Sequence, residues 1–345
     1  MAFAQLTHRE SLRDIEACLR ALPTKLYHLG IRGKVSRSTL ADANEARDWH
    51  VYADLAQTLL KIARPLYADD PFGAELDDTV YALDATTIDV SLGLCPWAPF
   101  QKSRGAVKMN TLLDLRGSLP TFIDITHGRS NDMAILDWMP LESGAFYVMD
   151  RGYLHFERLF RLHQSGAYYV TRAEKNTQYR RQRSRPVDRQ TGLRADQTIR
   201  LSGVTTRHTY PDPLRCVRYY DVATDQRFTF LTNNFLLPAL LIAQIYQCRW
   251  NIEVFFKWIK QHLRIKSFYG NSENAVKTQI WIAVSVYLLV AIAKKKLGVK
   301  ATLYTFFQVA GLTIFEKAPL WEVFDNTAHL VSYDNSSNQL NLFEI

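Results

Sequence analysis

Four polar side chains of different chemistry share one face of residues 240–263, a stretch without Gly or Pro. Its apolar residues recur every three or four positions, which predicts one long helix with a buried face. At about 100° per residue the four side chains span roughly 60° of the adjacent face; they are Tyr246, Arg249, Glu253 and Lys260. A carboxylate binds a divalent metal ion, and Arg and Lys bind phosphate. Helix-stabilising pairs, such as Glu253 with Lys257, are the alternative explanation.

Two further acids lie in predicted strands. Asp84 is in the middle of a strand at residues 80–89, and Asp150 directly follows a wholly apolar strand at 145–149. Carboxylate oxygens suit Mg²⁺ or Mn²⁺, and two such ions about 3.5–4 Å apart can assist in-line attack of water on phosphorus. An edge-strand charge and a strand terminator are the simpler explanations for the two acids. We predict that Asp84, Asp150 and Glu253 form a catalytic triad that binds metal.

The elements around these acids follow the order of a ribonuclease-H-like core. Predicted strands occupy 80–89, 106–115, 121–126, 145–149 and 167–171, and predicted helices occupy 131–141 and 155–163. In such a core the first Asp lies on the first strand and the second at the end of the fourth. The fold class is therefore α/β (α+β) with a mixed sheet, and the long helix returns to it with Glu253 after an interruption.

Other segments complete the predicted organisation. The interruption alternates apolar and polar residues after a basic start, which predicts a β-rich insertion, and the N-terminal region is helical. A second long helix is expected at 272–297, capped by Ser272 and closed by the lysines at 294–296, and a short helix is expected at 303–309. The expected divisions are a helical N-terminal region at 1–66, core at 76–174, insertion at 175–236, core at 237–325 and a tail at 326–345. In the N-terminal region, helices at 11–22, 38–46 and 48–63 and the cations Arg32, Lys34 and Arg37 indicate either a helix-turn-helix-like DNA reader or a small packing domain.

Composition excludes several classes of protein. The net charge of +8 and pI near 9.2 weakly favour a polyanionic partner. The four cysteines form no C-x-x-C pair, which argues against a zinc module or a disulfide framework. The apolar run at 280–293 is too short to span a bilayer, so we expect a buried helix in a soluble, cytoplasmic protein. The chain also lacks phosphate-loop, serine-hydrolase and zinc-protease motifs.

The motifs as a set resemble the insertion-sequence-4 family of DDE transposases. The resemblance runs from about Leu6 to residues 339–343, and its specific parts are residues 84–89, residues 150–153 and the Tyr246, Arg249, Glu253 and Lys260 set. It implies a bacterial, nucleoid-associated enzyme that cuts DNA at the terminal inverted repeats of its element and joins the ends to target DNA. It also implies a homodimer in the synaptic complex and a hairpin intermediate. Relatives commonly have residues ahead of the stretch at 8–14, so we expect the chain to begin inside its end-binding domain.

The same resemblance implies which residues contact DNA. Arg249, Tyr246 and Lys260 would grip phosphates near the transposon end, an assignment that suits the guanidinium fork and the ammonium charge. Trp250 would either stack on a displaced base or pack in the core. Further candidates for DNA contact, which solvated surface charges would explain equally well, are Lys257, Arg151, Lys102, Arg104, Lys108, Arg180, Arg181, Arg183 and Arg185.

Two alternatives to a transposase stay open on the sequence alone. A nuclease of the same fold would carry the same acids, and a strand-transfer assay separates it from a transposase. A DNA-binding protein derived from a transposase predicts a damaged triad, whereas all three acids are present in this chain. A glycosidase with paired carboxylates would leave Arg249 and Lys260 unexplained.

Overall fold

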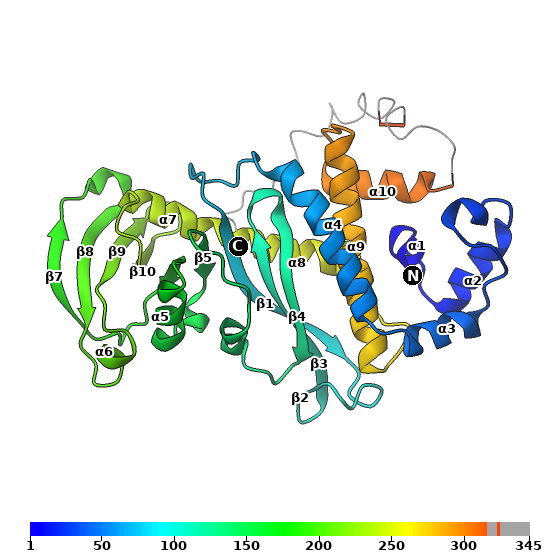
Figure 1. Ribbon diagram of the computed structural model, residues 1–345, viewed down its shortest axis with the longest axis horizontal. Coiled ribbons are helices and arrows are strands. Elements are labelled where there is room, and N and C mark those ends of the chain that lie inside the picture. The colour runs from blue at the N-terminus through cyan, green and yellow to red at the C-terminus, as the bar shows by residue number, and fades with distance from the viewer. Residues whose placement is uncertain (316–322, 325–345) are drawn as a thin grey trace. The chain divides into compact units, whose positions relative to one another are not determined.

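The computed structural model describes residues 1–315 and 323–324, so the predicted tail at 326–345 lies outside the described residues (Figure 1). The chain divides into two compact units. One contains Met1–Tyr67, Thr87–Val107 and Phe256–Ile345, and the other contains Ala68–Thr86 and Lys108–Phe255. Each unit is described by itself below.

The first unit begins with the helices α1 (Ala2–Leu6), α2 (Leu12–Ala21), the 3-10 helix η1 (Leu26–Leu29), α3 (Arg37–Ala46) and α4 (His50–Tyr67). The first three of these supply the buried side chains of a small apolar cluster, which are Ala4, Ile15, Leu19 and Leu26. The hydroxyls of Ser11 and Ser36 cap α2 and α3, as an N-cap oxygen does for unpaired backbone N–H groups. The predicted helices are confirmed, but α3 begins before Ser38, and α4 continues through Pro65 to Tyr67.

The predicted second long helix is α9 (Glu273–Lys296), which Ser272 caps as expected. It packs along α4, and the Tyr67 hydroxyl donates to the carbonyl of Ala291 at 2.9 Å. By length and composition α9 passes the test for a membrane span, yet 83% of its most apolar window is buried within the protein. A mostly buried helix of this kind is typical of a protein core. Helix α10 (Leu303–Thr313) extends beyond the short helix expected near residue 303.

The second unit contains the central sheet. Its core strands are β1 (Val80–Val90), β3 (Arg104–Asp114), β4 (Leu119–His127), β5 (Phe146–Met149) and β6 (Tyr168–Arg172). They lie in the order β4-β3-β1-β5-β6, with β5 parallel to both β1 and β6. This is the strand order of a ribonuclease-H-like core, so the predicted fold class is confirmed. A short strand, β2 (Pro99–Gln101), pairs with the start of β3, and both of these segments belong to the first unit.

The insertion continues the same sheet beyond β6. Its strands are β7 (Tyr179–Arg185), β8 (Leu193–Leu201), β9 (Leu214–Asp221) and β10 (Gln226–Thr232), in the order β6-β10-β9-β8-β7. The β-rich character of the insertion is therefore as predicted. Strand β7 was not predicted because its basic residues, exposed except at the two ends, show no alternation of apolar and polar side chains.

Two helix predictions were wrong in detail. The expected helix at 131–141 is a short 3-10 helix, η3 (Asp132–Asp137), which Asn131 caps. It ends before Pro140, and the residue ahead of a proline is disfavoured in the helical region. The expected single helix at 240–263 is two helices, α7 (Ala239–Cys248) and α8 (Trp250–His262). They are separated at Arg249, where bonds to the third preceding residue replace the usual α-helical bonds.

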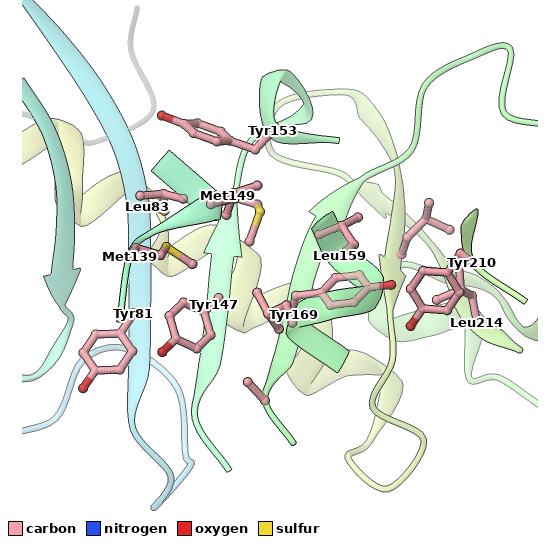
Figure 2. Packing of buried hydrophobic residues seen from close by; sticks show 14 of the residues in the cluster. Tyr81, Leu83, Met139, Tyr147, Met149, Tyr153, Leu159, Tyr169, Tyr210 and Leu214 are labelled. Carbon is pink, nitrogen blue, oxygen red and sulfur yellow. The ribbon is translucent and has the colours of Figure 1, made fainter. Parts of the chain in front are cut away.

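The core of the second unit packs around aromatic rings from adjacent strands (Figure 2). The rings of Tyr81 on β1 and Tyr147 on β5 have centroids 5.4 Å apart. Tyr169 on β6 makes an edge contact with Tyr210, which is contributed by the insertion. Helix α5 (Phe156–Gln164) covers these rings with Leu159. Because buried side chains continue from β1 into the insertion, this core fixes the strands that carry the first two acids.

Candidate active site

Asp84 and Asp150 lie next to each other because of the parallel pairing of β1 and β5. The register pairs Leu83 with Met149, and each acid is the following residue on its strand. Paired strands are about 4.8 Å apart. The Asp84 Oδ1 accepts the N–H of Ala85 at 2.8 Å, and its side chain is 23% exposed. Burial on the preceding residues thus fixes both acids at the point where the pairing ends.

Asp150 is held by a turn of its own. Its Oδ1 accepts the N–H of Gly152 at 2.6 Å and caps the 3-10 helix η4 (Arg151–Tyr153). The carbonyl of Asp150 accepts the Thr171 hydroxyl of β6 at 3.0 Å. A Cβ added to Gly152 would meet this Oδ1 at 2.9 Å, closer than real Cβ contacts allow. Only glycine leaves the Asp150 carboxylate undisturbed in this orientation.

Arg249 joins the third acid to the first. Its Nη1 donates to Asp84 Oδ2 at 3.1 Å, and its Nη2 donates to Glu253 Oε1 at 2.6 Å. Arg249 lies at the break between α7 and α8, and Glu253 is in the first turn of α8. One guanidinium therefore bridges carboxylates from β1 and α8.

The electrostatics of this centre are dominated by excess negative charge in a partly buried place. The pKa of Asp84 is raised to about 6, mainly by burial and also by the nearby Asp150 and Glu253. The Ala85 N–H and Arg249 oppose this rise in the pKa but do not cancel it. A carboxyl held this far above its ordinary pKa favours a bound cation in addition to Arg249.

Tyr153 is a member of this centre that the sequence did not indicate as functional. Its side chain is 3% exposed, and its hydroxyl has no hydrogen-bond partner within the described part of the protein. Burial raises the pKa of this phenol, as do Asp84, Asp132 and Asp150. The sequence feature that could have indicated a function for Tyr153 is its position within residues 150–153. A tyrosine after a strand can equally be a core residue.

Comparison with known proteins identifies the family of the chain. Residues 75–289 match the family described as Transposase DDE domain. The chain belongs to the DDE transposase family. This family generally uses divalent metal ions, which agrees with three acids on β1, after β5 and on α8. Residues 1–32 separately match a domain of unknown function, DUF4372.

Curated relatives support the family assignment. A putative transposase, y4zB, of Sinorhizobium fredii is 34% identical over 81% of this chain and 77% of its own length. A probable transposase for insertion sequence element IS5377 of Geobacillus stearothermophilus is 32% identical over 60% of this chain and 54% of its own. Among solved structures, the piggyBac transposase synaptic complex with hairpin DNA has a TM-score of 0.41 and 13% identity, covering 73% of this chain and 57% of that one.

The donor set of the transposase suits a hard divalent cation. Asp84, Asp150 and Glu253 offer only oxygen atoms, as Mg²⁺ and Mn²⁺ prefer. Among the residues that the structure describes, no three His, Cys, Asp or Glu side chains are grouped closely enough to hold a metal ion. Two of the three carboxylates are instead bridged by Arg249. The three acids therefore have the oxygen ligands that the ion prefers. The Arg249 guanidinium places a positive charge between Asp84 and Glu253.

The predicted DNA contacts on the long helical segment have different surroundings. Trp250 is 46% exposed, whereas the Tyr246 ring is buried and lies 4.7 Å from the Phe230 ring. Lys260 donates to the carbonyl of Thr87 at 2.8 Å, and burial lowers the pKa of its ammonium. Lys257 is exposed. Trp250 and Lys257 are thus open to a ligand, while Tyr246 and Lys260 are held by protein groups.

The remaining basic candidates for DNA contact also divide into residues that are paired with acids of the protein and residues that are exposed. Lys108 is paired with Asp132 at 2.7 Å, and Arg104 is paired with Asp89 at 2.9 Å. Arg185 contacts the buried Asp196 at 3.3 Å. The exposed members are Arg151, Lys102, Arg180, Arg181 and Arg183.

Proposed function

We propose that this transposase moves an insertion sequence by cut-and-paste transposition, hydrolysing phosphodiester bonds at the element ends and then transferring the new 3′ ends to target DNA. The observation that carries the proposal is the grouping of three carboxylates: strand pairing places Asp84 and Asp150 next to each other, and Arg249 bridges Asp84 to Glu253. A protein surface with no ligand gains nothing from such an arrangement, because it costs stability at neutral pH.

We assign Asp84, Asp150 and Glu253 as the catalytic residues that hold Mg²⁺ or Mn²⁺, with two ions as the working number. When bound, such ions increase the nucleophilicity of water and stabilise the leaving oxygen of an in-line displacement. The chain contributes the orientation of the carboxylates. Asp150 is fixed by the Gly152 N–H, and Asp84 is fixed by its own strand and by the Ala85 N–H.

We assign Arg249, Tyr246, Lys260, Trp250, Lys257 and Arg151 as DNA contacts. Arg249 neutralises Asp84 and Glu253 in the free protein, and an incoming phosphate would offer its guanidinium a second, bidentate partner. Exchange of Arg249 from carboxylate to phosphate would leave those carboxylates available to cations as DNA arrives. The half-exposed indole of Trp250 is available to stack on a displaced base.

The partners of this chemistry are DNA and a second copy of the chain. The terminal inverted repeats of the element and the target DNA would be the two substrates. A homodimer would bring two ends together in a synaptic complex. A bacterial element presents both substrates in the nucleoid, so we propose that the transposase works in the cytoplasm.

The test is cleavage and strand transfer of a labelled duplex that carries the element's inverted repeat, with Mg²⁺ present and then removed by chelation. Glu253→Ala should abolish both reactions without preventing binding. Glu157→Ala is the matched control, because Glu157 is an exposed acid on α5, outside the carboxylate centre.

Three other outcomes would overturn the proposal in different ways. Cleavage without strand transfer would indicate a nuclease. Binding of the ends without cleavage by the parent would indicate a DNA-binding protein. Full activity of Glu253→Ala would remove Glu253 from the metal site.

A further inference from the structure

A cavity of about 600 Å³ lies where the insertion joins the core, within the second unit. Its walls come from η4, the end of β6 and the loop after it, and strands β9 and β10. The charged side chains in its lining are Arg151, Arg172, Lys175, Arg218, Arg227 and Glu174. Five cations and one acid thus surround a space large enough for several phosphate-sized groups.

These cations are not neutralised by the protein. Within the described part of the chain, none of the five forms an ion pair with a carboxylate. Elsewhere in the same insertion, by contrast, Arg215 and Arg185 both contact Asp196. Concentrated positive charge in a hollow attracts and retains an anion far more strongly than the same charge spread over a surface.

Neutral contacts hold the cations in place. Arg218 donates to the Tyr179 hydroxyl at 2.7 Å, and the Arg172 guanidinium lies 4.9 Å from the centre of the Phe228 ring. Arg218 is in register with Thr229 of β10, and Arg227 is two residues from Thr229 and on the same face of that strand. The guanidinium groups of Arg172 and Arg218 are therefore positioned before any ligand arrives.

The cavity shares residues with the reactive centre. Arg151 follows Asp150, and Thr171, which donates to the Asp150 carbonyl, precedes Arg172. The Arg172 guanidinium is also close enough to the Tyr246 phenol, one of the residues assigned to DNA, for its charge to act on the pKa of that phenol. A ligand in the cavity would therefore lie beside the acid that we assign to catalysis.

We infer that this cavity binds consecutive phosphates of a DNA strand next to the phosphodiester that is cut. The inference rests on the proposed function, and it adds a site formed jointly by the core and the insertion. Arginine forks and the hydroxyls of Thr177, Ser202 and Thr229 are suited to phosphate oxygens. Strand β7 begins at the cavity with Tyr179 and continues with the exposed Arg180, Arg181 and Arg183. A positive path leading away from the cavity favours a long polyanion over a small one.

The experiment measures binding of a fluorescent 20-base-pair duplex of arbitrary sequence in EDTA, so that no cleavage is needed. Lys175→Glu with Arg227→Glu reverses two exposed cavity cations. Arg189→Glu with Arg207→Glu is the matched control, with the same charge change at exposed insertion residues outside the cavity lining. The cavity variant should bind at least about tenfold more weakly, and its salt dependence should decrease by roughly two released counterions. The control should lose less than about threefold.

Two further measurements keep the inference falsifiable. Neutral methylphosphonate groups placed one at a time should weaken binding of the parent at a few adjacent positions and have no effect there on the cavity variant. Arg227→Gln, a milder change, should give an intermediate loss if the double variant is unstable on heating.

Equal losses in the cavity variant and the control would overturn the inference, because general charge would then explain both. Tight binding of inorganic pyrophosphate by the parent, with DNA affinity unchanged in the cavity variant, would indicate a small-anion site instead. If the parent neither cleaved nor transferred element ends while the cavity variant still lost binding, the proposed function would fail and this site would remain.

Discussion

The second unit contains two assemblies of aspartate with arginine that differ in how completely they are satisfied. In the insertion, Asp196 and Arg215 are both buried and meet through two bonds of 2.9 Å. Arg215 also donates to the carbonyls of Asn234 and Leu237. At the candidate active site, Arg249 gives one bond each to Asp84 and Glu253, and Asp150 adds a third carboxylate nearby.

This difference distinguishes a structural ion pair from a functional one. A buried pair is tolerated when each charge has its partner and its remaining hydrogen bonds. Three carboxylates around one guanidinium leave net negative charge. This charge, together with burial, raises the pKa of Asp84. A cluster of charges that the protein itself does not neutralise is therefore a better indicator of a ligand-binding site than a balanced ion pair.

The largest effect should come from Asp84→Asn. The amide keeps the shape of the side chain but loses the charge that holds metal, so activity should fall on the order of 10³-fold or more, as for other residues that act as a unit. The unfolding temperature should stay the same or rise, because a buried charge is removed. Cleavage assays and thermal unfolding measure the two effects. Asp54→Asn on the exposed side of α4 should change neither, and a folded but fully active Asp84→Asn would refute the assignment.

The opposite pattern is expected for Asp196→Ala. Removal of Asp196 leaves Arg215 buried without its carboxylate, which should cost about 3–5 kcal/mol in the free energy of unfolding. Denaturant titration gives this value. Asp212→Ala, which removes a half-exposed pair with His163, should cost less than about 1 kcal/mol. Similar losses at Asp196 and Asp212 would contradict the structural role of the buried pair.

Divalent metal should stabilise the two assemblies unequally. A ligand that binds the folded state at a hundred times its Kd adds about 2.7 kcal/mol to the free energy of unfolding. Mn²⁺ should therefore raise the unfolding temperature of the parent and of Asp212→Ala by a few degrees. It should have little effect on Asp84→Asn or Glu253→Ala. A uniform increase in all four proteins would mean that the ion binds somewhere else.

The smallest effect concerns pH. The pKa of Asp84 is about 6 in the folded protein and near 3.8 in the unfolded chain, so the folded state binds more protons between these values. The free energy of unfolding should therefore decrease as pH rises from about 4 to about 6, by about 2 kcal/mol relative to Asp84→Asn. Denaturant titrations of both proteins across pH 4 to 8 test the sign. A parent that gained stability over this interval, relative to the variant, would contradict the raised pKa.

Much of the fold could be predicted from the sequence, because hydrophobic periodicity and helix-end residues act over short stretches of the chain. Alternation identified β1, the apolar run identified β5, and Ser272 with the three lysines at 294–296 bounded α9. The two aspartates were found because each occupies a defined position relative to a buried strand. Parallel pairing then brings them together without any further signal in the sequence.

The features that were missed depend on distant contacts. Residues 240–263 contain no Gly or Pro, and the break at Arg249 coincides with bonds to two carboxylates, one of them far away in sequence. Strand β7 forms through pairing with β8 despite its basic sequence. The cavity draws Arg151, Arg172, Arg218 and Arg227 from separate segments, none of which is unusual alone.

The close approach of Gly152 to Asp150 has a genetic consequence. Any side chain at residue 152 displaces a carboxylate that is half-buried, while the surrounding sheet stays packed. A missense change in this codon should therefore yield a folded protein whose Asp150 carboxylate is displaced. If it binds DNA ends and forms the homodimer as we propose, such a protein would assemble with intact copies, and a damaged copy of the gene would inhibit transposition by the intact ones.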